Sequence, residues 1–129
     1  MNIDTAVNYV ERALRLAQKR HNLIRNNVVG GKTLEPMYNS IVQQLIFLRN
    51  IVTGDEKDKS RLWELTFGMY AAKEFEASDP IFADRLFDAF YIASQIRQGL
   101  KVKFPHQVNP NYYLKQKELL SLYPEDYYV

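Results

Sequence analysis

The chain of 129 residues is 47% hydrophobic and 25% charged, which suits the core of one ordinary domain and excludes an intrinsically disordered protein. It has no cysteine, so disulfides and thiolate metal sites are excluded. Residues 1–53 carry seven basic and three acidic groups, residues 54–100 six and nine, and residues 101–129 four and three. This dipolar distribution around a net charge of +2 argues against a nucleic-acid-binding protein.

The hydropathy pattern gives no sign of a membrane protein or a secreted one. No window approaches the roughly 18 uninterrupted apolar residues that span a bilayer. The N-terminus includes Asp4 and Glu11 and lacks a basic segment followed by an apolar one, so we see no signal peptide. We therefore expect a cytoplasmic protein.

An apolar stripe at helical spacing predicts a first helix over residues 5–25, with Asp4 or Thr5 as its N-cap. The stripe consists of Ile3, Val7, Val10, Leu14 and Ala17. The opposite face is basic and carries Arg12, Arg15, Lys19 and Arg20. Asparagine and glycine between residues 26 and 31 should break this helix.

A second helix is expected with Pro36 in its first turn and Gly54 at its end. Its stripe consists of Tyr38, Ile41, Leu45, Leu48 and Val52.

After a charged turn, Asp58 or Ser60 is expected to cap a third helix. The residues predicted to face inward are Leu62, Leu65, Met69 and Ala72. Gly68 inside this helix costs about 1 kcal/mol relative to alanine, and close helix packing would explain its presence.

A fourth helix is predicted over residues 80–98, because Asp79–Pro80 matches an N-cap followed by N1 and Gly99 matches the C′ position. One face carries Phe82, Leu86, Phe90, Ala93 and Arg97, with Phe87, Tyr91 and Ser94 beside it.

Residues 101–104 alternate like a short extended piece that Pro105 stops, and a fifth helix is predicted over residues 110–122. The end, YPEDYYV, should be loosely held unless it docks. Four amphipathic helices bury their stripes best against each other, so we expect an all-α, antiparallel four-helix bundle-like domain. Residues 1–105 would form it, with a short C-terminal helix and an aromatic, acidic tail in residues 106–129, packed on it or extending from it.

The search for chemistry finds no catalytic motif, metal-ligand set or cofactor loop. His21 and His106 lack companions and are expected to be exposed. Asp84 and Asp88 share a helical face, which indicates a solvated face or an acidic patch for a partner, and only remotely catalysis. The tail tyrosines beside Glu125 and Asp126 form a docking strip or fold back on the bundle. We expect a protein that is not an enzyme and has no cofactor or metal.

Scattered motifs over residues 5–105 resemble the family of helical immunity proteins that neutralise the type VI secretion NAD(P)+ glycohydrolase effector of Pseudomonas. The motif residues are Leu65–Thr66, Gly68, Ala72–Lys73–Glu74–Phe75, Asp79–Pro80, Leu86, Asp88–Ala89, Tyr91, Arg97, Gly99–Leu100–Lys101–Val102 and Pro105. Upstream, Tyr9-x-x-Arg12-Ala13-Leu14, Gln44–Leu45 and Leu48–Arg49 look similar too. The loop around residues 28–32 and the segment 106–129 depart from the family pattern.

The resemblance implies an all-helical cytoplasmic protein that is not an enzyme. It implies an antitoxin that binds a cognate interbacterial toxin domain, first of all an NAD(P)+-degrading one, and blocks its active site. A pyrophosphokinase or ADP-ribosyltransferase toxin is an alternative target. A helical adaptor or scaffold domain without a toxin is the alternative from another class. The oligomeric state stays open.

On this hypothesis an acidic surface covers the substrate cleft of the toxin, whose cationic groups would bind a nucleotide phosphate. The residues expected to contact the toxin are Tyr70, Glu74, Glu76, Asp79, Asp84, Asp88 and Tyr91.

Overall fold

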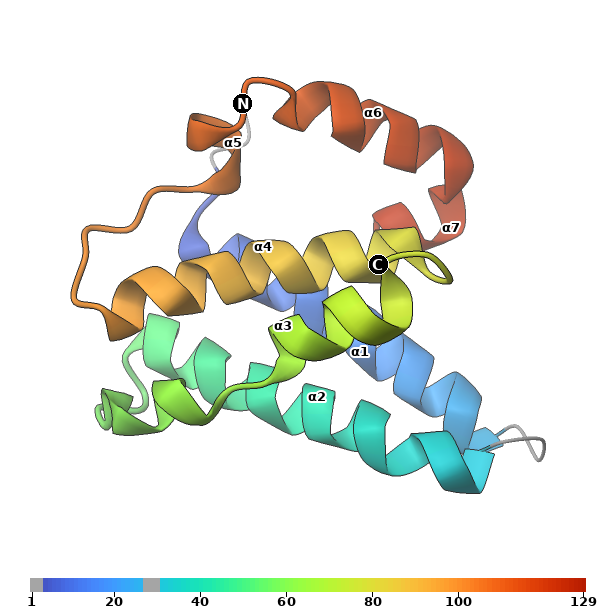
Figure 1. Cartoon of the computed structure of the whole chain (residues 1–129), viewed down its shortest axis with the longest axis horizontal. Coiled ribbons are helices and arrows are strands. Elements are labelled where there is room, and N and C mark those ends of the chain that lie inside the picture. Colours follow the sequence, from blue (N-terminus) through green and yellow to red (C-terminus); the bar gives the residue numbers. More distant parts are fainter. Residues whose placement is uncertain (1–3, 27–30) are drawn as a thin grey trace.

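The computed structural model describes residues 4–26 and 31–129, and within these ranges every regular element is helical (Figure 1). The elements are α1 (Ala6–Asn26), α2 (Gly31–Thr53), the 3-10 helix η1 (Lys59–Glu64), α3 (Phe67–Tyr70), the π-helical turn η2 (Ala71–Phe75), α4 (Pro80–Arg97), α5 (Pro105–Val108), α6 (Tyr112–Leu122) and α7 (Pro124–Tyr127). The predicted all-α class is confirmed. None of these helices combines the length and the apolarity needed to cross a membrane.

The core lies between α1, α2 and α4, with the short helices η1 and α3 packed against α4. Most members of the predicted apolar stripes are buried, as an amphipathic helix requires. Val7, Val52 and Phe90 are partly buried, and Ile3 lies outside the described residues. The largest fully buried side chains are Val10, Leu16, Ile41, Leu45, Leu48, Leu62, Phe67, Ile81, Phe82, Leu86 and Ile92. The bundle-like arrangement expected from the stripes is therefore present.

The start of α1 is fixed by reciprocal hydrogen bonds that identify Thr5 as its cap. Asn8 N–H donates to Thr5 Oγ1 at 3.3 Å, and Thr5 N–H donates to Asn8 Oδ1 at 2.8 Å. These bonds satisfy two of the backbone donors that a helix start leaves open. The predicted break after α1 falls largely on residues 27–30, outside the described residues.

The second helix begins earlier than predicted, because α2 starts at Gly31 and places Pro36 inside the helix. The expectation that Pro36 occupies the first turn is wrong. Proline lacks an N–H, so at this position it removes one hydrogen bond toward the first turn and leaves the rest of α2 intact. Gly54 ends the helix with a φ of 86°, as predicted.

The predicted third helix is wrong as a continuous element, because it divides into η1, α3 and η2. Asp58 caps η1 by accepting from Ser60 N–H at 3.0 Å. At the next junction the side chain of Gln44 in α2 accepts from the N–H groups of Thr66 and Phe67 at 2.7 and 3.0 Å. This contact turns the chain and changes which residues face inward.

The change of register explains which residues of the predicted stripe are buried. Leu62 and Leu65 are buried as expected, whereas Met69 is 55% exposed and Ala72 is also exposed. The residues that continue the core after the turn are Phe67, Ala71 and Phe75. Gly68 packs tightly: a Cβ atom there would lie 2.6 Å from Cγ of Phe90. The predicted close approach of the two helices is confirmed.

Residues 105–129, which we call the C-terminal arm, fold back on the bundle. Figure 1 shows α6 running above α4 and α7 returning toward it. Leu119 joins the main core, and the partly buried Tyr123, Tyr127 and Val129 pack against it. The predicted division after residue 105 falls at the start of α5, a helix the sequence did not predict. The arm thus docks on the bundle.

Candidate protein-binding surface

The outward side of α4 and its C-cap residue form a stripe of four residues at helical spacing: Phe87, Tyr91, Ser94 and, at the cap, Gln98. Residues at intervals of three and four lie on one helical face. Phe87 and Tyr91 are each 37% exposed, although both are aromatic. The stripe stays open because the neighbouring elements pack on the two flanks of α4 and leave this face to solvent.

On one flank of the stripe, η1 presents an exposed tryptophan. Trp63 is 62% exposed, and the guanidinium of Arg97 lies 4.6 Å from its ring centroid. A cation–π contact of this kind holds both side chains in place at the surface. Tryptophan and arginine are also the residue types most enriched among the dominant contributors to protein–protein binding.

On the other flank, Gln95 fastens the extended segment that follows α4. Lys103 N–H donates to Gln95 Oε1 at 2.8 Å, and Gln95 Nε2 donates to the carbonyl oxygen of Lys103 at 2.8 Å. The N–H of Leu100 also donates to the carbonyl oxygen of Gln95 at 3.0 Å. These bonds hold residues 100–103 beside the last turns of α4.

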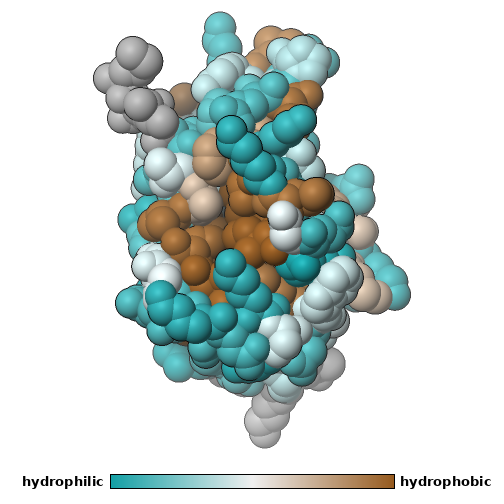
Figure 2. All heavy atoms as spheres, turned by 90° about the vertical axis from the view of Figure 1, so that its left-hand side faces the viewer, coloured by the Kyte–Doolittle hydropathy of each residue, from teal (hydrophilic) through white to brown (hydrophobic). Residues whose placement is uncertain are grey.

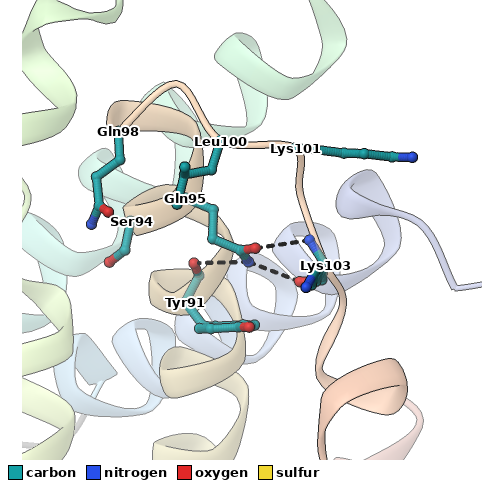
Figure 3. A pocket seen from close by; sticks show the side chains of 7 residues that line it. All are labelled: Tyr91, Ser94, Gln95, Gln98, Leu100, Lys101 and Lys103. Atoms are coloured by element: carbon teal, nitrogen blue, oxygen red, sulfur yellow. Dashed lines mark hydrogen bonds between the residues drawn. The ribbon is translucent and has the colours of Figure 1, made fainter.

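Between this segment and α4 lies a shallow hollow of about 540 Å³ (Figure 3). Its lining residues are Tyr91, Ser94, Gln95, Gln98, Leu100, Lys101 and Lys103. Figure 3 shows the side chain of Lys101 pointing away from α4 toward solvent, while Gln95 reaches toward Lys103. Neither Lys101 nor Lys103 forms an ion pair with any residue in the described ranges. The hollow therefore combines apolar and polar lining residues with two lysines that have no acidic partner among the described residues.

Apolar atoms gather on the same side of the molecule. Figure 2 views the side where the end of α4 and residues 98–104 lie, and hydrophobic atoms fill the middle of that face. The apolar residues of this stretch are at least partly exposed: Ile96, Leu100, Val102 and Phe104. We call the stripe, Trp63 and the hollow together the α4 surface.

The acidic residues predicted to contact a toxin do not form one surface. Glu74 and Glu76 are exposed, and Tyr70 is half-buried against the core. Asp84 is only 6% exposed, so the expected solvated or partner-binding face at this residue is wrong. The inward-facing carboxylates serve internal contacts.

Asp79 occupies the N-cap position of α4, yet its carboxylate makes no cap hydrogen bond. It accepts from Arg20 Nε at 2.8 Å and from Nη2 at 3.1 Å. The same guanidinium donates to Asp126 of the arm at 2.8 Å, and Lys19 binds Asp126 at 2.6 Å. Hydrogen bonds from Arg20, followed by those from Lys19, lower the pKa of Asp126 to about 2. Part of the basic face of α1 thus holds the arm.

A second polar cluster lies between α4 and α6. Arg85 Nη1 donates to Asp84 Oδ2 at 3.0 Å and to Gln116 Oε1 at 2.8 Å. Nearby, Asp88 has a buried Oδ2 atom without a hydrogen-bond partner in the described part of the chain. Burial, followed by the charge of Asp84, raises the pKa of Asp88 to about 8. A carboxyl group that is protonated at neutral pH is a poor electrostatic contact for a cationic toxin cleft.

The expectation of two exposed histidines is also wrong. His21 Nε2 lies 2.8 Å from Glu35 Oε1, and the His21 side chain is 12% exposed. His106 Nδ1 lies 2.7 Å from Tyr9 Oη, and the two rings are stacked. Among the described residues no group of three or more His, Cys, Asp or Glu side chains is placed to hold a metal ion.

Of the predicted contact residues, Tyr91 lies on the α4 surface, and Phe87 and Ser94 were expected beside the apolar face of the helix without a role in binding. The alternation of Lys101 to Phe104 indicated an extended segment, yet nothing local showed that Gln95 would hold it. The exposure of Trp63 was not predicted, because this residue fell in a third helix that was predicted as continuous and with the wrong register.

In a comparison with known protein families, residues 5–95 match the family model described as Tsi6. The chain is 33% identical over 104 residues to the immune protein Tsi6 of Pseudomonas aeruginosa, covering 78% of this chain and 99% of that protein. It matches the structure of Tse6 in complex with Tsi6 with a TM-score of 0.68 at 31% identity, over 79% of this chain and 100% of that chain. It matches the structure of Tsi6 from Pseudomonas aeruginosa with a TM-score of 0.62 at 31% identity, over 79% and 98%. The C-terminal arm lies beyond the family model, which ends at residue 95.

Proposed function

Because this chain belongs to the Tsi6 family, we propose that it is an immunity protein that binds and inhibits a cognate toxin domain. The observation that carries the proposal is the match to the solved complex of Tse6 with Tsi6, with a TM-score of 0.68 over the whole of the matched chain. The protein acts in the cytoplasm, where it meets a toxin delivered in interbacterial competition, and it acts by binding rather than by catalysis.

The mechanism we propose is steric. A bound immunity protein that covers the substrate cleft prevents the toxin from reaching its nucleotide. An NAD(P)+-degrading toxin is the first choice, with pyrophosphokinase and ADP-ribosyltransferase toxins as alternatives. Three residues of the expected contact set, Glu74, Glu76 and Tyr91, are exposed and available for this contact. Asp79 and Asp84 are engaged in internal contacts, which makes them positioning residues for the fold.

The test is co-expression of the full chain with the toxin domain encoded next to its gene. We expect restored growth and a complex that co-purifies in a defined ratio. A toxin variant without activity controls for expression, and intracellular NAD+ measured without the immunity protein identifies the chemistry. If the chain neither rescues growth nor co-purifies, the immunity function is excluded and a helical adaptor domain becomes the better hypothesis.

A further inference from the structure

We propose that the α4 surface is the toxin-binding face, and that an acidic segment of the toxin docks at the rim of its hollow, where Lys101 and Lys103 lie. The inference rests on the proposed function and deepens it by assigning the face and the chemistry of the contact. Three independent observations support it: the arm covers another face, the open face is rich in interface residue types, and its two lysines are unpaired.

The arm covers one side of the bundle, so a toxin cannot bind the helices there directly. It is anchored to α1 through Asp126 on Arg20, to α4 through Gln116 on Arg85, and to α1 again through His106 on Tyr9. The relatives are matched over 98–100% of their length by 79% of this chain, so the arm is additional to the shared domain. A binding mode built on the shared helices must therefore use a face that the arm leaves open.

The composition of the α4 surface is that of a binding site. It exposes Trp63, Phe87 and Tyr91, with Arg97 stacked under the tryptophan. Aromatic and arginine side chains supply large contact areas at small entropic cost, and they dominate measured interface energies. Scattered exposed apolar residues need no explanation, but a cluster around a hollow favours a partner.

The charges of the hollow identify the chemistry of the occupant. Lys101 and Lys103 stand at its rim without a carboxylate partner in the described residues. Ser94 donates its hydroxyl proton to the carbonyl oxygen of Phe90 at 2.9 Å, so its oxygen retains an acceptor site but offers no free proton. Two ammonium groups then supply the charged donors, and an aspartate or glutamate side chain of the toxin is the complementary group.

Gln95 is the positioning residue of this arrangement. It is 8% exposed, and it satisfies both backbone groups of Lys103. The rigid link fixes the lysine segment before binding, and a segment ordered in advance loses less entropy on association. A partner would therefore meet a rim that is already formed.

The experiment compares single charge reversals in the full-length protein. Lys101→Glu and Lys103→Glu are each expected to weaken affinity for the purified, inactivated toxin domain by about tenfold or more, and Tyr91→Ala by a similar factor. The matched control is Lys117→Glu on α6, because Lys117 is also exposed and forms no ion pair with any described residue. We expect the control to change the affinity by no more than about twofold.

The outcomes separate the two levels of the proposal. If wild-type protein binds the toxin and all three variants bind as the control does, the assignment of the face is overturned while the immunity function stands. If wild-type protein neither binds nor protects, the immunity function itself fails. If the chain alone forms a dimer that Lys101→Glu disrupts, a second copy occupies the face and the assignment is again overturned. Circular dichroism of each variant confirms that the helical fold is retained.

Discussion

The bundle of α1, α2 and α4 and the C-terminal arm are held by different forces. The bundle buries leucine, isoleucine, valine and phenylalanine side chains that are close to fully enclosed. The arm contributes Pro105, Tyr112, Gln116 and Leu119 as its buried residues. It relies on directional contacts: an ion-pair network at Asp126, hydrogen bonds at Gln116 and stacked rings at His106. Its helix α6 otherwise faces solvent.

This difference separates what makes a domain fold from what an extension adds to it. Apolar burial is non-directional and stabilises the whole bundle cooperatively. Charged and aromatic contacts act at single points, so each anchor of the arm should fail separately from the bundle. We expect the arm to be the less stable region, and mutations can test this.

The largest expected effect comes from a matched pair of leucine truncations. Leu45→Ala removes a side chain that is 0% exposed in the bundle and should lower the free energy of unfolding by about 2–5 kcal/mol. Leu119→Ala, at 5% exposure in α6, should cost less and mainly increase hydrogen exchange within the arm. Chemical denaturation and hydrogen exchange measure the two effects. Equal losses of global stability would show that arm and bundle unfold as one unit.

The ion-pair network is the next test, because Arg20 joins the start of α4 to the arm. Arg20→Met leaves Asp79 and Asp126 without their shared partner and should cost about 1.5–3 kcal/mol, with increased exchange in α7. Lys19→Met is the control: its side chain is 37% exposed, and its loss should cost less than about 1 kcal/mol. A larger effect from Lys19 than from Arg20 would contradict this ranking.

Acid should weaken the ion pairs of Asp126 with Arg20 and Lys19. The pKa of Asp126 is lowered to about 2 in the folded protein, so its stabilising contribution is present above the ordinary carboxyl pKa. That contribution is lost as the pH falls from about 4 toward 2. In Asp126→Asn this part of the acid dependence should disappear, as thermal unfolding across that pH range would show.

A smaller loss is expected at the contact between α3 and α4. In Gly68→Ala the new Cβ atom would meet the ring of Phe90 at 2.6–2.9 Å, so the ring or the helix must shift. The better helix propensity of alanine offsets part of the strain, which leaves about 1–2 kcal/mol of destabilisation. Gly68→Ala combined with Phe90→Leu should recover some of it. An increase in stability from the single variant would contradict the close packing.

Asp88 gives an effect that is absent near pH 4 and grows as the pH rises, and its sign is the clearest. Its pKa is raised to about 8, so the folded protein holds a proton that the unfolded chain releases near pH 4. Folding stability therefore falls as the pH rises from about 4 to 8. Asp88→Asn should have little effect at pH 4 and increase stability relative to wild type at pH 9. Parallel pH profiles for the two proteins would exclude the raised pKa.

Sequence periodicity predicted the long helices well, because each apolar stripe has to face the core. Leu14 in α1, Leu45 in α2 and Leu86 in α4 are all buried as expected. It failed between residues 58 and 76, where Gln44 accepts hydrogen bonds from a junction 22 and 23 residues away along the chain. A local pattern carries no information about such a partner. The stripe was therefore continued through a turn that changes its register.

The candidate site was predicted less well, since whether a carboxylate faces solvent depends on distant partners. Asp79 pairs with a residue 59 positions away, and Asp84 accepts a hydrogen bond from one 32 positions away. Charge and spacing alone made both look like an acidic face. Tyr91, predicted as a contact from its residue type and its place beside the buried stripe, is exposed on α4. The hollow beside Lys101 and Lys103 could not be predicted from the sequence, because it forms only where Gln95 holds the segment after α4.

The most direct test of the central claim is hydrogen–deuterium exchange of the full chain, alone and bound to the inactivated toxin domain. We predict that complex formation protects residues 87–103 and the segment around Trp63, while α6 exchanges at the same rate in both states. Protection concentrated in α6 and α7, with residues 87–103 unchanged, would contradict the assignment and place the toxin on the arm instead.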